Sequence, residues 1–508
     1  MTAVKRPART RAQICGLAAG PVLFFSFLFL DLAPGRPVVT RMAAVAALMA
    51  VWWITEAIPI SATALIPMVF FPLMGILKAK ATAPIYFNST IFLFIGGFII
   101  AMAMEKWGLH KRIALSIIRF VGGGPARIVF GFMAASAFLS MWISNTATSI
   151  MMLPIGLAII FQMESDFDAT TTKNFTKALM LGIAYACSVG GIATIVGTPP
   201  NLSFARIFSI TFPHAEPISF GQWFVMGLPL SIGMLLVIWF ILVKVMYRPS
   251  SNLSVDRSVV DNEYQRLGPM GFEERVVMVI FATTALLWVF RKKIILGTLV
   301  IPGWSSLLPY PDMIDDGSVA LAMTLLLFLI PAKSRNSAAI IGVDAIRGLP
   351  WDIVLLFGGG FALAKGFQAT GLSTVIGKEF SGLAGMPPFV MVAMICLVIT
   401  FLTELTSNTA TTEMILPILA SVAVGLKINP MFLMIPATLS ASCAFMMPVA
   451  TPPNTIVFGS GRLSISDMAK AGIIINFIGI TIISIFFYFV GPYVFGIDPT
   501  RFPAWAGF

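Results

Sequence analysis

The sequence predicts an all-α polytopic membrane protein with about eleven transmembrane helices, two re-entrant hairpins and an inverted-topology repeat. Three observations support this fold class. Of the 508 residues, 58% are hydrophobic and only 11% are charged, whereas about a quarter of the residues in a soluble domain are charged. Apolar segments of near-spanning length recur along the chain, and a set of polar motifs occurs twice in the same order.

This composition excludes several classes of protein. The 33 Lys and Arg and 22 Asp and Glu residues cannot cover the helices of a water-soluble protein of this size, and four cysteines are too few for a disulfide scaffold. The net charge of the chain is +11, and in a membrane protein such an excess of Lys and Arg usually lies in the cytoplasmic loops. We expect no nucleic-acid partner, because no basic patch with interleaved aromatic residues accompanies the charge.

The predicted spans begin after a basic N-terminus that contains Lys5 and Arg6. This start favours a retained first helix with a cytoplasmic N-terminus over a cleaved signal peptide. The apolar segments follow in the order 14–30, 42–54, 62–77, 91–104, 178–197, 224–243, 276–290, 319–331, 353–364, 431–449 and 473–490. Several are shorter than the roughly 20 residues of a full span, so they must tilt or extend into polar flanking residues.

Two further regions predict hairpins that enter the membrane without crossing it, near 128–163 and near 387–425. In each, two short apolar arms flank a polar knot, at 144–148 and at 407–411. Arms of this length place the polar knot at mid-depth, which fits a re-entrant hairpin better than two extra spans.

The two halves of the chain repeat each other. The sequence Ser-Asn-Thr-Ala-Thr occurs at 144–148 and again at 407–411, an offset of 263 residues that also relates Gly-Gly-Phe at 96–98 and 359–361. Thr-Pro-Pro-Asn occurs at 198–201 and at 451–454. Five predicted spans separate the two hairpin tips, an odd number, so the second hairpin enters from the opposite side of the membrane.

This repeat also sets the predicted domain organisation. The expected parts are an N-terminal segment with the first span at 1–40, the first repeat at 41–246, a cytoplasmic linker at 247–274, the second repeat at 275–497 and a C-terminal tail at 498–508.

The polar motifs predict two cages of oxygen atoms. A chain that turns inside the membrane leaves carbonyl groups without helical partners, and Ser, Asn and Thr add side-chain oxygens, which suit a hard cation such as Na⁺. The double prolines break the fifth and tenth spans. Helices that begin at the tips direct their positive ends to mid-membrane and favour an anion there. None of the four motifs contains Lys or Arg, so bound cations would supply the missing positive charge.

Three acidic residues within or near the predicted spans, Glu56, Glu404 and Glu413, are candidates for function, because an ionisable group in a membrane is costly. For Glu404, which adjoins the second tip, a role in coupling and a pairing with backbone or solvent both remain open.

Paired Ser-Asn-Thr motifs on opposed hairpins, each followed by a Thr-Pro-Pro-Asn break, resemble the divalent anion/sodium symporter family, in its sodium-coupled dicarboxylate branch. The resemblance extends from Glu56-Ala-Ile-Pro to the second Thr-Pro-Pro-Asn. It implies a homodimer in which each protomer has a scaffold domain and a transport domain that moves as an elevator. It also implies a plasma-membrane location, in a bacterium the inner membrane.

The resemblance further implies which residues bind each ligand. The substrate would be bound by Ser144, Asn145, Thr146, Thr198, Pro199, Ser407, Asn408, Thr409, Thr451 and Pro452. The first sodium site would use Ser140, Ser144, Asn145 and the backbone near Gly197, and the second would use Thr403, Thr406, Asn408 and the backbone near Ala450.

We therefore expect a sodium-coupled symporter of four-carbon dicarboxylates such as succinate, fumarate and malate, with Na⁺ as the co-transported ion and no organic cofactor. Alternatives are the same fold carrying citrate or sulfate, a 2-oxoglutarate/dicarboxylate exchanger, and an anion channel, since re-entrant loops also form selectivity filters. An enzyme is not expected, because the sequence contains no nucleophile–base pair or metal cluster that would support one.

Overall fold

The computed structural model of the chain describes residues 9–250, 253, 258–296, 299–335, 337–380, 382, 385–498 and 501–507. Within these residues the fold is mostly helical, with two short strands, in agreement with the predicted class. Eight helices are long and apolar enough to cross a membrane, and several shorter apolar helices accompany them. Lys5 and Arg6, and part of the predicted linker and C-terminal tail, lie outside the described residues.

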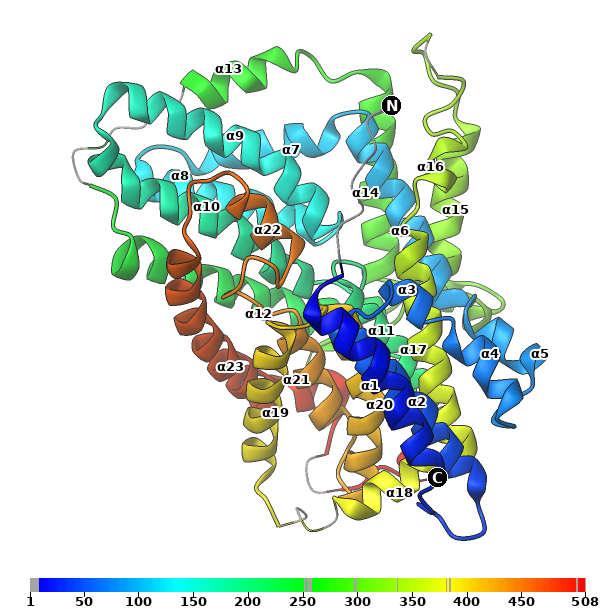
Figure 1. Cartoon of the computed structure of the whole chain (residues 1–508). Coiled ribbons are helices and arrows are strands. Elements are labelled where there is room, and N and C mark those ends of the chain that lie inside the picture. Colours follow the sequence, from blue (N-terminus) through cyan, green and yellow to red (C-terminus); the bar gives the residue numbers. More distant parts are fainter. Residues whose placement is uncertain are drawn as a thin grey trace, which may run out of the picture.

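The N-terminal part consists of two long helices packed on each other, a run of short helices and two more helices (Figure 1). Their bounds are α1 Arg11–Leu28, α2 Pro37–Thr55, α3 Ile60–Thr63, α4 Ile66–Leu73, α5 Ala79–Thr82, α6 Ser89–Lys106 and α7 Leu109–Val121. The predicted span 62–77 is not one continuous helix, because Pro67 lacks the N–H that a continuous helix would need.

The first hairpin and the first broken helix follow. Their bounds are α8 Pro125–Ser140, α9 Asn145–Asp166, α10 Ala169–Ile192, α11 Pro199–Thr211 and α12 Phe220–Phe240, with a π-helical turn at Ile241–Met246. The break predicted at the first proline pair is confirmed: α10 ends at Ile192 and α11 begins at Pro199. Proline favours the first position of a helix, where no N–H is required.

The middle of the chain connects the halves. Its elements are α13 Ser258–Arg266, α14 Phe272–Val289, the antiparallel strands β1 Ile294–Leu296 and β2 Leu299–Ile301, α15 Asp316–Leu329, α16 Asp344–Arg347, α17 Trp351–Thr370 and α18 Leu372–Glu379. Short 3₁₀ turns lie at Ala83–Ile85, Trp304–Leu307, Pro311–Met313 and Ala504–Ala506. Helix α15 packs on α6, and α13 packs on α7.

The second hairpin and the second break complete the fold. Their elements are α19 Pro388–Thr403, α20 Asn408–Gly425, α21 Met431–Ala441, α22 Pro452–Phe458 and α23 Ile465–Phe495. The expectation of a continuous apolar span over 431–449 is wrong, because α21 ends at Ala441 and the next ten residues are not helical. Side chains from neighbouring helices bind the backbone of this segment, as described below, and replace the helical hydrogen bonds.

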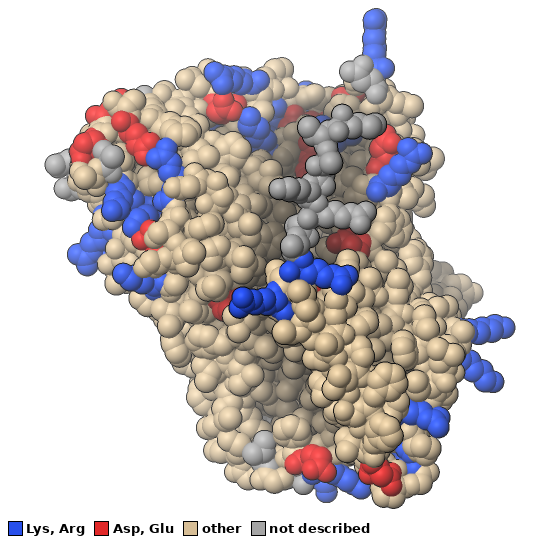
Figure 2. Space-filling model, viewed as in Figure 1, with Lys and Arg blue, Asp and Glu red and all other residues tan. Residues whose placement is uncertain are grey.

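Charged side chains lie mainly near the edges of the face shown in Figure 2. The lower left of that face, where Figure 1 places α19 and the lower part of α23, carries almost no charge. Helix α19 contains no charged residue at all, and many large apolar side chains on these two helices are exposed. An apolar, exposed surface of this kind fits contact with lipid acyl chains.

Candidate functional site

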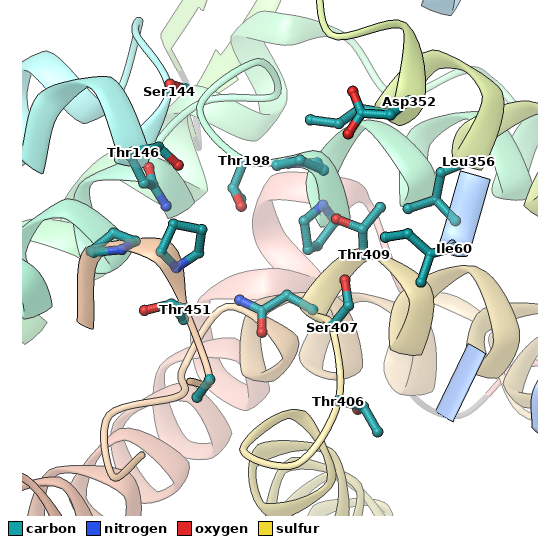
Figure 3. A pocket seen from close by; sticks show the side chains of 18 of the residues that line it. Ile60, Ser144, Thr146, Thr198, Asp352, Leu356, Thr406, Ser407, Thr409 and Thr451 are labelled. Carbon is teal, nitrogen blue, oxygen red and sulfur yellow. The ribbon is translucent and has the colours of Figure 1, made fainter. Parts of the chain in front are cut away.

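A cavity of about 680 Å³ lies where the two hairpin tips and the two helix breaks meet. In Figure 3, Ser144, Thr146 and Thr198 lie on one side of this space, with Thr451, Ser407 and Thr409 around the rest of it. All ten residues predicted to bind substrate line this cavity, namely Ser144, Asn145, Thr146, Thr198, Pro199, Ser407, Asn408, Thr409, Thr451 and Pro452. The structure thus brings together four segments that are far apart in the sequence.

The first hairpin tip is a turn between α8 and α9 that is closed by side chains. The hydroxyl of Ser140, at the end of α8, donates a hydrogen bond to Oδ1 of Asn145. The hydroxyl of Ser144 caps α9 by accepting a hydrogen bond from the backbone N–H of Ala147 at 3.2 Å. Ser140 is fully buried and lies behind the cavity wall, so of this pair only Asn145 reaches the cavity.

The first break approaches this tip closely. A methyl group added at Gly191 would lie 2.9 Å from the carbonyl oxygen of Gly197 and 3.0 Å from Oδ1 of Asn145. One small region therefore contains three of the predicted sodium ligands, Ser140, Asn145 and Gly197. Only a glycine at position 191 leaves room for these groups to approach one another. This arrangement provides hydroxyl, amide and carbonyl oxygens without a charged side chain.

The non-helical segment of the first break is held by two polar side chains. The amide Nδ2 of Asn201 donates to the carbonyl oxygens of Thr194 at 2.7 Å and Gly191 at 3.2 Å. The hydroxyl of Thr194 donates to the carbonyl oxygen of Met141, in the hairpin turn, at 2.6 Å. These bonds tie the break to the tip and satisfy carbonyl groups that the interrupted helix leaves unpaired.

The second hairpin tip repeats the geometry of the first. The hydroxyl of Thr403, at the end of α19, donates to Oδ1 of Asn408 at 2.5 Å. Thr403 and Asn408 correspond to Ser140 and Asn145 through the 263-residue offset. Thr406 lines the cavity, and its hydroxyl lies 2.9 Å from the carbonyl oxygen of Leu402. Thr403, like Ser140, is fully buried behind the wall.

The second break is anchored by Glu404, a residue whose role the sequence left open. Its Oε1 accepts hydrogen bonds from the backbone N–H groups of Phe445 at 2.7 Å and Met446 at 2.9 Å, and from Nδ2 of Asn476 at 2.7 Å. Its Oε2 accepts one from the N–H of Met447 at 3.0 Å. Four donors satisfy an ionised carboxylate, which only accepts hydrogen bonds. The structure therefore shows Glu404 paired with the backbone, and the residue also lines the cavity.

Backbone groups and neutral side chains provide the positive potential of the cavity. Helices α9 and α20 begin at Asn145 and Asn408, so their positive ends face the cavity. Helices α11 and α22 also begin here, but each starts with two prolines, which have no N–H to donate. Among the lining residues that the structure describes there is no Lys or Arg.

Sequence reasoning missed part of the wall. Asp352 lines the cavity together with Glu56, which was flagged, and with apolar residues that include Leu356 and Ile60 (Figure 3). Asp352 lies just before the predicted segment 353–364, so its place at the end of a span was a signal that could have been used. These two carboxylates, together with that of Glu404, which also lines the cavity, would repel a dianion that has no accompanying cation.

Comparisons with known proteins agree with this geometry. Residues 20–497 match the family described as the sodium:sulfate symporter transmembrane region. The chain is 42% identical, over 97% of its length and 94% of the relative's, to the sodium-dependent dicarboxylate transporter SdcS of Staphylococcus aureus. It is 40% identical to the SdcS protein of Staphylococcus saprophyticus, over 96% of this chain and 93% of that one.

Two solved structures share the fold at low sequence identity. The Alcanivorax borkumensis YdaH transporter aligns with a TM-score of 0.56 at 14% identity, over 93% of this chain and 98% of the other. Neisseria gonorrhoeae MtrF aligns with a TM-score of 0.56 at 12% identity, over 92% and 98%. These likenesses support the architecture and not the cargo.

Proposed function

Because the chain belongs to the sodium:sulfate symporter family, which is also known as the divalent anion/sodium symporter family, we propose that it is a sodium-coupled symporter of four-carbon dicarboxylates. It is a multi-pass membrane transporter, and relatives more than 40% identical over most of its length are named as sodium-dependent dicarboxylate transporters. Succinate, fumarate and malate are the proposed substrates, and Na⁺ is the co-transported ion.

The observation that carries this proposal is the pair of matching tips around one cavity. In each tip a hydroxyl side chain donates to the oxygen of the Asn that begins the next helix. The proposed first sodium site consists of Ser140, Ser144, Asn145 and the carbonyl of Gly197, and the second of Thr403, Thr406, Asn408 and the carbonyl of Ala450. Two cations held beside one cavity provide the positive charge that the lining side chains lack.

The substrate would lie between the tips. One carboxylate would meet Ser144, Asn145 and Thr146, the other would meet Ser407, Asn408 and Thr409, and the segments that begin at Thr198 and Thr451 would close the sides. Free N–H groups in the first turns of α9 and α20 are suited to carboxylate oxygens. A dianion with charges at its two ends matches a cavity with two such ends.

The proposed transport movement is that of an elevator. In this proposal α1–α7 and α14–α18 form a scaffold, and α8–α12 with α19–α23 form a transport domain that contains both tips and both breaks. The protomers would pair through their scaffolds as a homodimer in the bacterial plasma membrane, with the N-terminus in the cytoplasm.

Uptake into proteoliposomes tests the function. Labelled succinate should accumulate when external Na⁺ is present and should not when Na⁺ is replaced by K⁺. Unchanged uptake after this replacement would refute sodium coupling, and uptake that does not saturate would indicate a channel. Competition by unlabelled citrate, sulfate and 2-oxoglutarate, and exchange against internal dicarboxylate, separate the alternative cargoes and the exchanger from the proposed symporter.

The site assignment has its own test. Asn145→Ala and Asn408→Ala should each abolish uptake, because each removes an oxygen from a sodium site and the side chain at one end of the substrate. The matched control is Asn174→Ala, since Asn174 lies outside the cavity and its side-chain amide donates to the carbonyl oxygen of Arg248. Elution as a folded protein from a sizing column confirms that each variant is intact. Full activity in either cavity variant would refute the assignment.

A further inference from the structure

A second buried glutamate, Glu413, has no part in the proposed sodium and substrate sites. It lies in α20, one and a half turns beyond the second tip, and its side chain is fully buried. Its Oε1 accepts a hydrogen bond from the hydroxyl of Ser203 in α11. Its Oε2 is buried and has no hydrogen-bond partner among the described residues. The carboxyl group thus has one neutral donor, where Glu404 has four.

Helix α17 covers this carboxyl group. At Gly360, in the middle of α17, an added methyl group would overlap Oε2 and Cδ of Glu413 and would lie 2.6 Å from its Cβ. Glycine is required here because the side chain of Glu413 occupies the space. Helices α11, α17 and α20 pack against one another around this point. In the elevator proposal, α17 belongs to the scaffold and α11 and α20 to the transport domain, so Glu413 lies in the sliding interface.

In the part of the chain that the structure describes, no cationic side chain pairs with Glu413. The charged residues on the elements that pack against α20 are Arg41 on α2, Arg206 on α11, Asp352 and Lys365 on α17, and Lys378 and Glu379 on α18. Among the described residues, no Lys, Arg or His nitrogen lies within 4.0 Å of the Glu413 carboxylate. An ionised carboxylate in such a place would be costly, so burial favours the neutral, protonated form of the group.

The internal repeat shows that the hairpin fold does not require the hydrogen-bonded pair of Glu413 and Ser203. The residue that corresponds to Glu413 in the first hairpin is Ile150, which is largely exposed, and the residue that corresponds to Ser203 in the second break is Ile456. At Gly97, the counterpart of Gly360, the nearest atom to an added methyl group is 3.6 Å away. The second half therefore has a hydrogen-bonded carboxyl and a tight cover that the first half lacks.

We propose that Glu413 is a proton-binding site of the transport cycle. The carboxyl group holds a proton while α17 covers it, and the proton returns to water when the transport domain carries α20 away from α17. The O–H bond on Oε2 breaks in the uncovered state and forms again, with a proton taken from water, before the group is covered. This inference rests on the proposed elevator movement and adds to it a step that depends on pH.

The consequence is a transport rate that falls as pH rises. An uncovered glutamate has a pKa near 4.3, so at neutral pH almost all molecules must bind a proton before α17 can cover the carboxyl group again. Where this step limits turnover, the rate should fall by up to tenfold for each unit of pH. A residue that cannot ionise, such as glutamine, removes the dependence.

The experiment measures sodium-driven uptake in proteoliposomes between pH 6 and 9 at saturating Na⁺. Fumarate is the substrate, because its carboxyl groups are stronger acids than those of succinate and it remains a dianion over this range. The wild-type rate should fall with rising pH, and Glu413→Gln should give a flat profile and exceed the wild type at pH 9. The matched control is Glu379→Gln, an exposed carboxyl on neighbouring α18, which should keep the wild-type profile.

A second variant and a spectroscopic readout protect the test against a folding defect. Glu413→Ile copies the first repeat and should also give a flat profile. The infrared spectrum of the wild type at pH 7 should contain a protonated-carboxyl C=O band that Glu413→Gln lacks. A flat wild-type profile, or a pH dependence that survives in both variants, would overturn the proton site while leaving the symporter intact. Absence of sodium-dependent uptake in the wild type would instead refute the proposed function.

Discussion

Replacing Glu404 with glutamine should destabilise the protein far more than replacing Glu413. The new amide nitrogen would face the N–H of Met447, now 3.0 Å from Oε2, so one buried donor loses its partner at a cost of about 1–3 kcal/mol. The other three donors, from Phe445, Met446 and Asn476, would bind a neutral instead of a charged oxygen, a loss of about 1 kcal/mol each. The sum is about 4–6 kcal/mol.

This cost can be measured by reversible unfolding in mixed micelles of dodecyl sulfate and a mild detergent. Glu413→Gln is the matched control, since it changes a neutral buried carboxyl into a neutral amide and should cost about 1 kcal/mol or less. Because the Glu404 bonds position the segment that ends at Ala450, surviving Glu404→Gln protein should also need more Na⁺ for half-maximal uptake. Equal stability of the two variants would show that Glu404 is not the anchor of the second break.

Three other changes test different parts of the structure. Arg112→Ala leaves Glu274, now bound at 2.6 and 3.0 Å, as an unpaired buried carboxylate, so the free energy of unfolding should fall by about 3–5 kcal/mol; a loss under 1 kcal/mol would contradict this. Gly191→Ala crowds the first proposed sodium site and should raise the Na⁺ concentration for half-maximal uptake in transport assays, without a change in substrate affinity at saturating Na⁺. A hydrogen bond from Lys111 lowers the pKa of Glu263 in α13. The Lys111–Glu263 pair therefore helps to dock α13 at any pH above the unfolded pKa of about 4.3, and this stabilisation is lost as pH falls through the lower pKa of the folded state. Proteolysis of α13 should stay slow from pH 8 to 5 and accelerate only below about pH 4.

Most of the cavity wall was predictable because the motifs that form it appear as interruptions in apolar sequence. Proline pairs break helices in any context, and Ser-Asn-Thr between short apolar arms marks a turn. The repeat then showed that Ser140 and Thr403 occupy equivalent places, and in the structure both bind the Asn that begins the following helix.

The roles of the two glutamates were not predictable, because they depend on contacts between helices that are distant in the chain. Glu404 binds backbone groups 41 to 43 residues away, in a segment that its apolar sequence suggested would be helical. The burial of Glu413 depends on Gly360 facing it from α17. Hydropathy shows that both residues are unusual in a membrane, but it cannot show that one has four donors and the other has one.

The two halves also link the hairpin turn to the helix break with different groups. Position 141 in the first turn corresponds to 404 in the second, and position 194 in the first break corresponds to 447 in the second. In the first half the side chain of Thr194 donates to the backbone carbonyl of Met141; in the second half the backbone N–H of Met447 donates to the side chain of Glu404. In both halves the break donates and the turn accepts, but the side chain is the donor in the first half and the acceptor in the second. Only the second link contains a carboxyl side chain, that of Glu404, which lies beside the proposed second sodium site. We therefore expect the two proposed sodium sites, which use the same kinds of oxygen ligand, to differ in electrostatic potential, and the second to attract a cation more strongly than the first.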